Sequence, residues 1–541
     1  MRTNGRPQVY PFLRIAVMLA LGIWAGFALY DGLIGIAGNT LIVAGGCLAT
    51  ASAIAVFACW RWPVPQSVAI LVAVFSLGLW WAVVYGVRHK VQLPAGYYDY
   101  HAVVVSRPTH SGPDTLRCDM LIVGGQLDGC RLRAKFPRCG RDLTLRVGDG
   151  MEVWSRLYAP QNWSRNLPDV NRRAARFDYK RWMRVHGFVA NTSIYEGMWR
   201  RQVIDLSGCR LVDRMQINAM RLRDKLLQRL SDSGVGGQSF AVAAAMTLGD
   251  KSELTSQLRE VYSVSGASHL LALSGLHLGI IYMLLSIIFL RHRRWVMVGQ
   301  AITILAIWFY VVLVGMSPSV VRAAVMVTIY ALAVMLGREQ ISLNALSLTA
   351  VVMLAANPLT LYDAGFQMSF LAVYSIIVCY RPIYTLANER WLLEHRAWRW
   401  LWSTVVVSVS AQICVAPLVA YYFGRFSCYF ILTNIVAVVL TTVIIYVSLS
   451  LYVCAALPFA ARGVAWVLDV LVRVLNGALE TIASLPGASI DGIKLNIVQL
   501  ALIYVIIACV YRLGYYVRKM YRSARGAAGL PVKWHGNGLD F

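Results

Sequence analysis

Several polar side chains stand within stretches of this sequence that are otherwise strongly apolar. Ser274 and His277 are three residues apart, a spacing that lets two side chains on one helix touch. Arg322, Asp363 and Gln367 occur in or beside later apolar stretches. A charged group at the centre of a bilayer costs roughly 2.5–3.5 kcal/mol on insertion scales, so such residues usually face a cavity or a partner. Together with His269, these residues are therefore candidates for a functional path.

Two kinds of chemistry fit these residues. Arginine and histidine donate hydrogen bonds to anions such as phosphate, so Arg322 and both histidines are candidate anion contacts. Asp363 would then pair with Arg322 or position it. A structural role also fits, with Arg322 and Asp363 as an ion pair between helices and each histidine in a hydrogen bond. Ser274 beside His277 has the spacing of a nucleophile and its base, which keeps an intramembrane serine hydrolase as an alternative.

The composition indicates what holds these residues. Hydrophobic residues make up 58% of the 541 residues, charged residues make up 14%, and the mean hydropathy is +0.58. A soluble protein with this balance could not cover its surface, whereas about 20 apolar residues cross a bilayer as a helix. We predict a polytopic α-helical membrane protein with about twelve spans, or fewer if some helices lie on the surface. The stretches are residues 12–30, 40–59, 67–87, 263–290, 296–314, 320–336, 344–356, 366–380, 403–422, 429–457, 464–485 and 495–513.

Three of these stretches need comment. Residues 344–356 are short for a full span. Residues 464–485 carry Asp469, Arg473 and Glu480 at helical spacing, so this segment either spans or lies along the membrane surface. The first stretch is followed at once by others and has no small-residue cleavage site, so we interpret it as an anchor.

The basic residues of the short loops predict the orientation. The amino terminus, the loop at residues 291–294, the loop at residues 381–399 and the tail beyond Leu513 are all rich in Arg or Lys. Placing them in the cytoplasm gives a consistent alternation of spans. Both termini are then cytoplasmic, and the long segment after the third stretch is extracytoplasmic. We expect a multi-pass protein of the cytoplasmic membrane.

That long segment is basic and starts with β-structure. Residues 88–230 hold 26 Lys and Arg against 13 Asp and Glu, so nucleic acid, anionic lipid or acidic polysaccharide would be a natural partner. A basic charge is also what a domain resting on phospholipid headgroups would carry. Short strands separated by turn residues predict a small OB-like β-barrel. They lie at residues 101–106, 115–123, 129–136 and 150–158.

A basic segment with interleaved aromatic residues follows at residues 172–186. Aromatic rings beside arginine can stack on bases and bind phosphates. The same rings also fit the packed face of an amphipathic helix. Residues 205–230 predict a further basic amphipathic helix that leads back to the membrane. The candidate nucleic-acid contacts of the soluble domain are Arg172, Arg173, Arg176, Lys180, Arg181, Trp182 and Arg184.

Four of the eleven cysteines lie in the soluble segment, and the compartment predicted for it is oxidising. Cys118 with Cys130 or Cys139 would join adjacent strands, although four cysteines allow three pairings. No Cys-x-x-Cys pair occurs, so we expect no zinc site, and nothing in the sequence calls for a cofactor.

Several motifs in the second half of the chain resemble the ComEC family, the inner-membrane DNA channel of natural competence. Residues 266–277 read Gly-Ala-Ser-His-Leu-Leu-Ala-Leu-Ser-Gly-Leu-His. Residues 315–323 read Gly-x-x-x-Ser-x-x-Arg-Ala, and residues 363–370 read Asp-Ala-Gly-Phe-Gln-x-Ser-Phe. An Asn-Pro pair at residues 357–358 also matches. The entry motif of the family corresponds to Gly249, Asp250 and Lys251.

The resemblance implies a DNA-transport function. One strand of duplex DNA would be threaded inward while the other is degraded outside, with the OB-like domain holding DNA and the helices forming the pore. Many members also carry a metallo-β-lactamase-like nuclease domain, and its His-x-His-x-Asp-His cluster is not found here. We therefore expect a short-form, non-enzymatic member that relies on a separate nuclease and on a periplasmic DNA receptor.

The energy source is expected to lie outside the chain. Inward movement of DNA carries negative charge against an inside-negative potential, at about 2.3 kcal/mol per charge per 100 mV. The run Gly249–Ser252 is too short to be a Gly-x-x-x-x-Gly-Lys-Ser/Thr phosphate loop. A cytoplasmic motor or strand-binding proteins would supply the force. A lipid or polysaccharide transporter remains the other alternative, since a basic domain would also hold anionic headgroups.

Five segments follow from these arguments. Residues 1–90 form a three-span membrane segment, and residues 91–200 form the extracytoplasmic OB-like domain. Residues 201–250 form a basic helical connector. Residues 251–515 form the competence-type channel domain, and residues 516–541 form a basic cytoplasmic tail.

Overall fold

The computed structural model describes residues 10–32, 38–110, 115–137, 145–162, 178–205, 207, 210–289, 296–336, 342–454 and 457–527. Within these residues, nine helices are long and apolar enough to cross a membrane. The prediction of a polytopic helical membrane protein is thereby confirmed. The nine are α1 (Pro11–Gly32), α2 (Gly38–Ala58), α3 (Pro63–Arg88), α10 (Val296–Leu313), α11 (Pro318–Met335), α13 (Ala364–Tyr384), α15 (Arg396–Phe423), α16 (Phe430–Cys454) and α18 (Ile497–Ala527).

The other three predicted stretches are helical but differ from the nine. The stretch at residues 344–356 forms α12 (Ser342–Ala356), which is short, as expected. The stretch at residues 263–290 is not one span, because the chain breaks there into α8 (Ser268–Leu271) and α9 (Gly275–Phe289). A twelve-residue apolar helix that the sequence analysis did not predict, α6 (Gly237–Leu248), is almost entirely buried.

The charged stretch forms α17 (Pro458–Ser484), which packs along α16 and α6. Its inner face buries Leu468, Val472, Leu475 and Leu479 completely. A row of charges lies beside this face, and two of them, Asp469 and Arg473, form an ion pair at 2.8 Å. α17 is therefore one of the packed helices of the bundle.

The soluble segment is a closed five-stranded barrel, so the barrel prediction is confirmed. The strand order is β1-β3-β4-β6-β5, and pairing of β1 with β5 closes the barrel. All neighbours are antiparallel except β4 and β6, which are parallel. The strands are β1 (Tyr97–Val104), β3 (Thr115–Val123), β4 (Arg131–Pro137), β5 (Gly150–Tyr158) and β6 (Phe188–Ser193), with β2 (Thr109–His110) beside β3 and β7 (Trp199–Arg201) beside β5.

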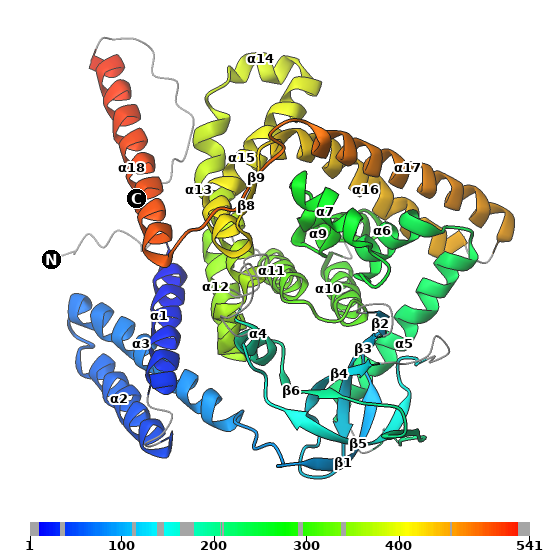
Figure 1. Cartoon of the computed structure of the whole chain (residues 1–541). Coiled ribbons are helices and arrows are strands. Elements are labelled where there is room, and N and C mark those ends of the chain that lie inside the picture. The colour runs from blue at the N-terminus through cyan, green and yellow to red at the C-terminus, as the bar shows by residue number, and fades with distance from the viewer. Residues whose placement is uncertain are drawn as a thin grey trace.

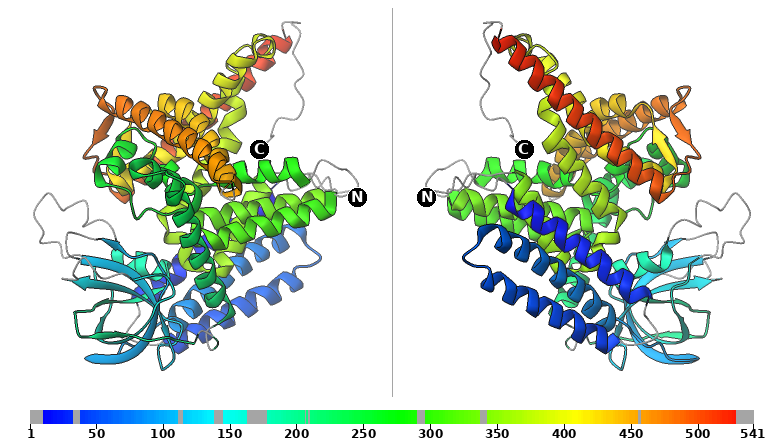
Figure 2. Two further views of the ribbon diagram at one scale, coloured as in Figure 1. Left: turned by 90° about the vertical axis from the view of Figure 1, so that its right-hand side faces the viewer. Right: turned by 90° about the vertical axis from the view of Figure 1, so that its left-hand side faces the viewer.

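Alternating side chains build the barrel core. In β5 every second residue is buried, as expected for a strand with one face inward. Met120, Leu132, Ala134, Met151 and Val153 are fully or almost fully buried. The barrel lies at one end of the helical part of the molecule (Figures 1 and 2).

The short elements connect the barrel to the helices. α4 (Tyr179–Val185) packs against the 3₁₀ helix η5 (Pro358–Tyr362), which precedes α13. α5 (Leu211–Asp232) leads from the barrel to α6. The remaining elements are α7 (Ser256–Val264), α14 (Glu389–Glu394) and the pair β8 (Arg425–Ser427) and β9 (Ser489–Asp491).

The predicted disulfide is not formed between Cys118 and Cys130. Both thiols are free, and Cys118 is buried. Cys118 lies opposite Ala134 in the β3–β4 ladder, whereas the carbonyl oxygen of Cys130 accepts from the amide of Ile122. The register therefore places the two cysteines four residues apart along the ladder, well beyond the roughly 7 Å Cα separation that a disulfide allows. Cys139 lies outside the described residues.

Glycines bring α1 and α3 into backbone contact. A Cβ atom added at Gly26 would lie 2.6 Å from the carbonyl oxygen of Leu79, and one added at Gly78 would lie 2.7 Å from that of Leu19. Small residues allow this close approach between membrane helices.

Substitution of Gly26 by alanine should therefore destabilise the α1–α3 contact. We expect a loss of about 1–3 kcal/mol, the usual cost of overpacking. The measurement is thermal unfolding of the purified full-length chain in detergent. Gly514→Ala on α18 is the matched control, because nothing lies within 4 Å of a Cβ there. Equal unfolding temperatures for the two variants would contradict the prediction.

Candidate functional site

The break between α8 and α9 creates a capped helix start. Ala272 has an extended backbone, and α9 begins three residues later at Gly275. The amide of Ser274 donates to Nδ1 of His277 at 3.3 Å, and the Ser274 hydroxyl lies 2.9 Å from the same nitrogen. A side chain at the third helical position that accepts from the N-cap amide is one half of a capping box. The contact between Ser274 and His277 therefore caps the amino-terminal end of α9.

This contact assigns the protons of the imidazole ring. A backbone amide is always a donor, so Nδ1 of His277 must accept, and the neutral ring then carries its proton on Nε2. The side chain is only 1% exposed, and Nε2 has no partner among the described residues. His277 therefore presents a buried donor without an acceptor.

Arg322 provides further donors at the same place. It lies on the second turn of α11, after the helix start at Pro318, and is 4% exposed. Its Nη2 would lie 3.3 Å from a Cβ at Gly275, so the glycine makes room for the guanidinium at the start of α9. Its charged end also lies 5.7 Å from the ring centre of Phe370. Nε and Nη1 have no partner within the described part of the chain.

We call Ser274, His277 and Arg322 the Arg322 cluster. The amino-terminal end of α9 adds the positive end of a helix dipole to a buried guanidinium. A buried charge without a partner costs several kcal/mol. Aligned donors of this kind are suited to bind an anion such as phosphate. His277 and Arg322 are buried in this structure, so a ligand could reach them only after the helices around them move.

Asp363 does not pair with Arg322, which corrects both versions of the sequence prediction. Its Oδ1 accepts from the amide of Phe366 at 2.8 Å and caps α13. Its Oδ2 lies 3.7 Å from Nε2 of His186, at the end of α4. One oxygen of Asp363 thus caps α13, as N-cap carboxylates commonly do, and the other contacts His186. Asp363 thereby links the barrel domain to the start of α13.

Gln367 and His269 are also held by local contacts. Gln367 donates to the carbonyl oxygen of Leu361 at 2.8 Å and accepts from the hydroxyl of Tyr422 at 2.9 Å. Nδ1 of His269 lies 3.1 Å from the carbonyl oxygen of Gly266, and its side chain is exposed. Of the six predicted channel residues, Ser274 and His277 are in contact, and Arg322 lies against Gly275 at the same helix start.

The predicted entry motif forms a hub of charges. Gly249 ends α6 in a left-handed conformation with φ of 70°. Asp250 is 5% exposed and accepts from Arg107 at 2.8 Å and from Arg223 at 3.2 Å. Arg107 comes from the barrel, just after β1, and Arg223 comes from α5. We call these three charged residues the Asp250 hub. The backbone carbonyl of the next residue, Lys251, accepts from Arg259 at 2.8 Å.

The aromatic residues of the basic segment pack against the protein itself. The Trp182 ring stacks on His186, with ring centres 4.4 Å apart, and the guanidinium of Arg133 lies 4.6 Å from its centre. Arg181 lies 3.5 Å from Asp31 on α1 and 4.4 Å from the ring centre of Tyr362. These contacts match the packed-face alternative. Lys180 and Arg184 are exposed, whereas Arg172, Arg173 and Arg176 lie outside the described residues.

A polar cleft that the sequence analysis missed lies between the barrel, α5 and the start of α6. Its volume is about 880 Å³. Burial raises the pKa of Asp224 in its wall, although Arg107 and Arg223 oppose this shift. The only sequence signal was the i,i+4 spacing of two of its cations on one helix. The charged residues of the cleft are the basic Arg107, Arg146, Arg221 and Lys225 and the acidic Asp149, Asp224 and Glu253.

No group of three or more potential metal ligands occurs among the described residues.

The family model and the named relative that match this chain indicate the same family. Residues 246–515 match the family model described as "Competence protein". The protein named "ComE operon protein 3" from Bacillus subtilis (strain 168) is 27% identical over 288 residues, which cover 53% of this chain and 35% of that protein. An "Uncharacterized protein" from Aquifex aeolicus (strain VF5) is 29% identical over 159 residues, covering 29% of this chain and 37% of that protein. The matched region thus spans little more than a third of these relatives, and no solved structure matches.

Replacing Asp250 by asparagine should loosen the barrel from the helices. Arg107 and Arg223 would lose their shared counter-charge, at a cost of about 3 kcal/mol, the low end for a broken buried ion pair. Glu253→Gln is the control, because Glu253 is exposed and its 3.4 Å contact with Arg107 should contribute less than about 1 kcal/mol. Thermal unfolding of both full-length variants in detergent measures the difference. An Asp250→Asn variant as stable as the control would show that the hub does not hold the domain.

Proposed function

We propose that this chain, which belongs to the ComEC family of competence proteins, passes single-stranded DNA across the cytoplasmic membrane during natural transformation. The observation that carries the proposal is the Arg322 cluster, a buried guanidinium with two unpartnered nitrogens beside an unpartnered imidazole N–H. The cluster lies inside the region that matches the family model. Phosphates passing one by one would offer the acceptors that these donors lack.

The cluster would act as a phosphate contact at a constriction. A site that binds each phosphate too tightly would stop movement, since conduction needs binding weak enough to release. Three donors from two helices satisfy this condition, because they bind one anion without enclosing it. The α8–α9 break is the segment whose movement would open the cluster to the strand.

The cleft beside α5 would receive DNA before it reaches the membrane. Four cations there approach from the barrel and from α5, next to the Asp250 hub. This arrangement replaces the aromatic face of α4 as our preferred DNA contact, since that face packs against the barrel and η5. The barrel side would then face the cell exterior, with both termini in the cytoplasm. A DNA receptor and a nuclease outside, and a motor or strand-binding proteins inside, would complete the system.

The contacts of Ser274 and His277 do not support the serine hydrolase alternative. Ser274 and His277 are close enough to act as nucleophile and base. A catalytic base, however, needs a further group to orient it, and Nε2 of His277 has no such partner among the described residues. The capping of α9 accounts for the pair instead.

Loss of the Arg322 guanidinium should reduce DNA uptake. We expect Arg322→Gln and His277→Phe each to lower transformation frequency at least about tenfold, the effect of losing roughly 1.4 kcal/mol of phosphate contact. Cells should contain equal amounts of each variant in the membrane. Arg462→Gln is the control, because Arg462 is an exposed arginine on α17 outside the cluster. Undiminished uptake in both cluster variants would overturn their role. A change in envelope lipid or polysaccharide with normal uptake would favour the transporter alternative.

Binding of DNA to the full-length chain in nanodiscs tests the cleft. Arg221→Gln combined with Lys225→Gln should weaken binding and lower the slope of log affinity against log salt by about 2, one unit for each phosphate contact. Lys180→Gln combined with Arg184→Gln removes two exposed cations of α4 and should have the smaller effect. The opposite order would return the DNA contact to α4. Failure of the unmodified chain to bind DNA at low salt would count against the whole proposal.

A further inference from the structure

Within the part of the chain that the structure describes, two polar contacts join helix α18 to α13 and α15. Near its outer part, by the orientation predicted from the loops, the hydroxyl of Tyr504 donates to the carbonyl oxygen of Cys414 on α15 at 2.8 Å. Further along, Nη2 of Arg518 donates to the carbonyl oxygen of Pro382 on α13 at 2.7 Å. The two residues are fourteen positions apart, which is about 21 Å along a helix.

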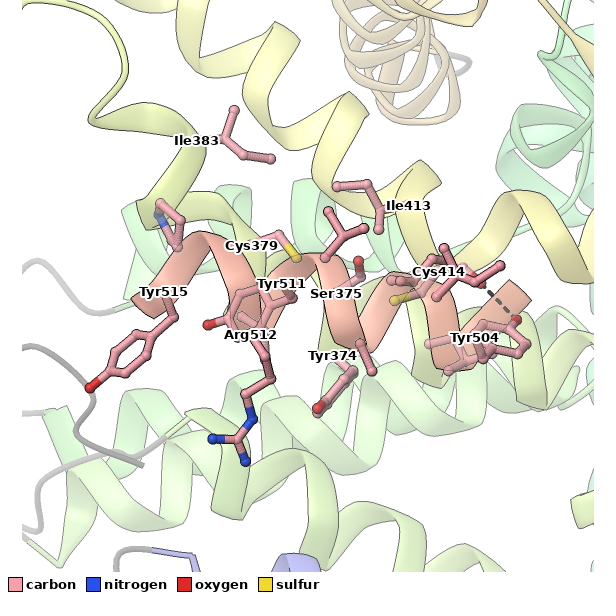
Figure 3. Close-up of a pocket in the computed structure, with 17 residues that line it drawn as sticks. Tyr374, Ser375, Cys379, Ile383, Ile413, Cys414, Tyr504, Tyr511, Arg512 and Tyr515 are labelled. Carbon is pink, nitrogen blue, oxygen red and sulfur yellow. Dashed lines mark hydrogen bonds between the residues drawn. The ribbon is translucent and has the colours of Figure 1, made fainter. Parts of the chain in front are cut away.

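An open cavity of about 620 Å³ lies between these two contacts, bordered by α13, α15 and α18 (Figure 3). Its lining is almost entirely apolar apart from hydroxyl and thiol groups, and Arg512 stands at its edge. The side chains of α18 that face it include large rings, which hold the helix away from its neighbours. The residues used in the argument below are Val378, Cys379, Cys414, Ile507 and Tyr511.

The position of the cavity restricts what fills it. Val498, Leu502 and Val505 of α18 do not line the cavity and are 56–63% exposed, as expected of a helix that faces lipid. Water is a poor occupant, because a buried water needs two to four polar partners. A void would forfeit the dispersion contacts of its whole lining. The volume falls within the roughly 300–1,000 Å³ of ordinary small-molecule sites, so an acyl chain is a suitable occupant.

The basic side chain of Arg512 at the edge of the cavity indicates that the lipid headgroup is anionic. Arg512 is exposed, and its guanidinium extends away from the cavity in Figure 3, toward the rim. Arg518 and Lys519 follow within two turns of the same helix. Basic residues at the end of an apolar helix attract anionic headgroups with about 1 kcal/mol each.

We propose that the groove between α13, α15 and α18 binds an anionic phospholipid of the leaflet next to the basic end of α18. One acyl chain fills the cavity, and the phosphate lies beside Arg512. The lipid thereby takes the place of the direct side-chain packing that α18 lacks between its two polar contacts. This site is separate from the Arg322 cluster and does not depend on DNA transport.

Native mass spectrometry of the full-length chain, with phosphatidylglycerol or phosphatidylethanolamine added as probe, tests the proposal. We expect the chain to retain phosphatidylglycerol. Cys379→Trp should fill the cavity and lower retention at least about tenfold. Cys509→Trp is the matched control, because Cys509 is an exposed residue of α18 that does not line the cavity. Cys379→Phe is a smaller filler for use if the tryptophan variant does not fold.

A second variant tests the headgroup. Arg512→Gln should keep bound lipid but reduce the preference for phosphatidylglycerol over phosphatidylethanolamine about fivefold, as loss of one cation implies. Three outcomes would overturn the proposal. The folded Cys379 variants could retain as much lipid as the Cys509 control. The unmodified chain could retain no lipid after mild delipidation. A crosslinker attached at Cys379 could capture a helix of another protein in place of lipid.

Discussion

One buried carboxylate joins the barrel to two of the helices. Asp250 accepts from Arg107 of the barrel and from Arg223 of α5, and its backbone follows directly after the end of α6. The barrel, which has its own core, and helices α5 and α6, which share another core, therefore meet at a single charge. The buried pair is satisfied only when all three parts are in place, so the hub favours one arrangement of the domains over others. The polar cleft beside α5 has its shape because the hub fixes its walls.

Local patterns in the sequence were sufficient for most of the architecture. Long apolar stretches predicted the membrane helices, and alternation with turn residues predicted the barrel strands. Contacts between distant segments were not predictable in this way. Asp363 and Arg322 are opposite charges near helix ends, which suggested a pair. The capping of α13 by Asp363 was a local signal that the pairing argument overlooked, and the contact with His186 brings together residues 177 positions apart.

The Arg322 cluster also depends on contacts between distant segments that the sequence did not predict. Hydropathy alone made residues 263–290 one span, because Ala272, Leu273 and Ser274 do not lower the average of the window enough to mark a break. The contact between Ser274 and His277 fixes the start of α9 and therefore the position of the break. Gly275 leaves room for Arg322 to approach that helix start. Sequence reasoning selected the right residue types for this cluster. It also included His269, Asp363 and Gln367, which serve local structure in the contacts described here.

The charges of α17 have a consequence for how the protein enters the membrane. Each charge near mid-bilayer costs roughly 2.5–3.5 kcal/mol when a helix is inserted alone. α17 carries Arg462, Asp469, Arg473 and Glu480, and follows the strongly apolar α16 after a short connection. α16 and α17 would therefore insert as one hairpin, with the Asp469–Arg473 pair already formed and the apolar α16 offsetting the cost. Biogenesis, more than the finished fold, would be the stage at which this pair matters most.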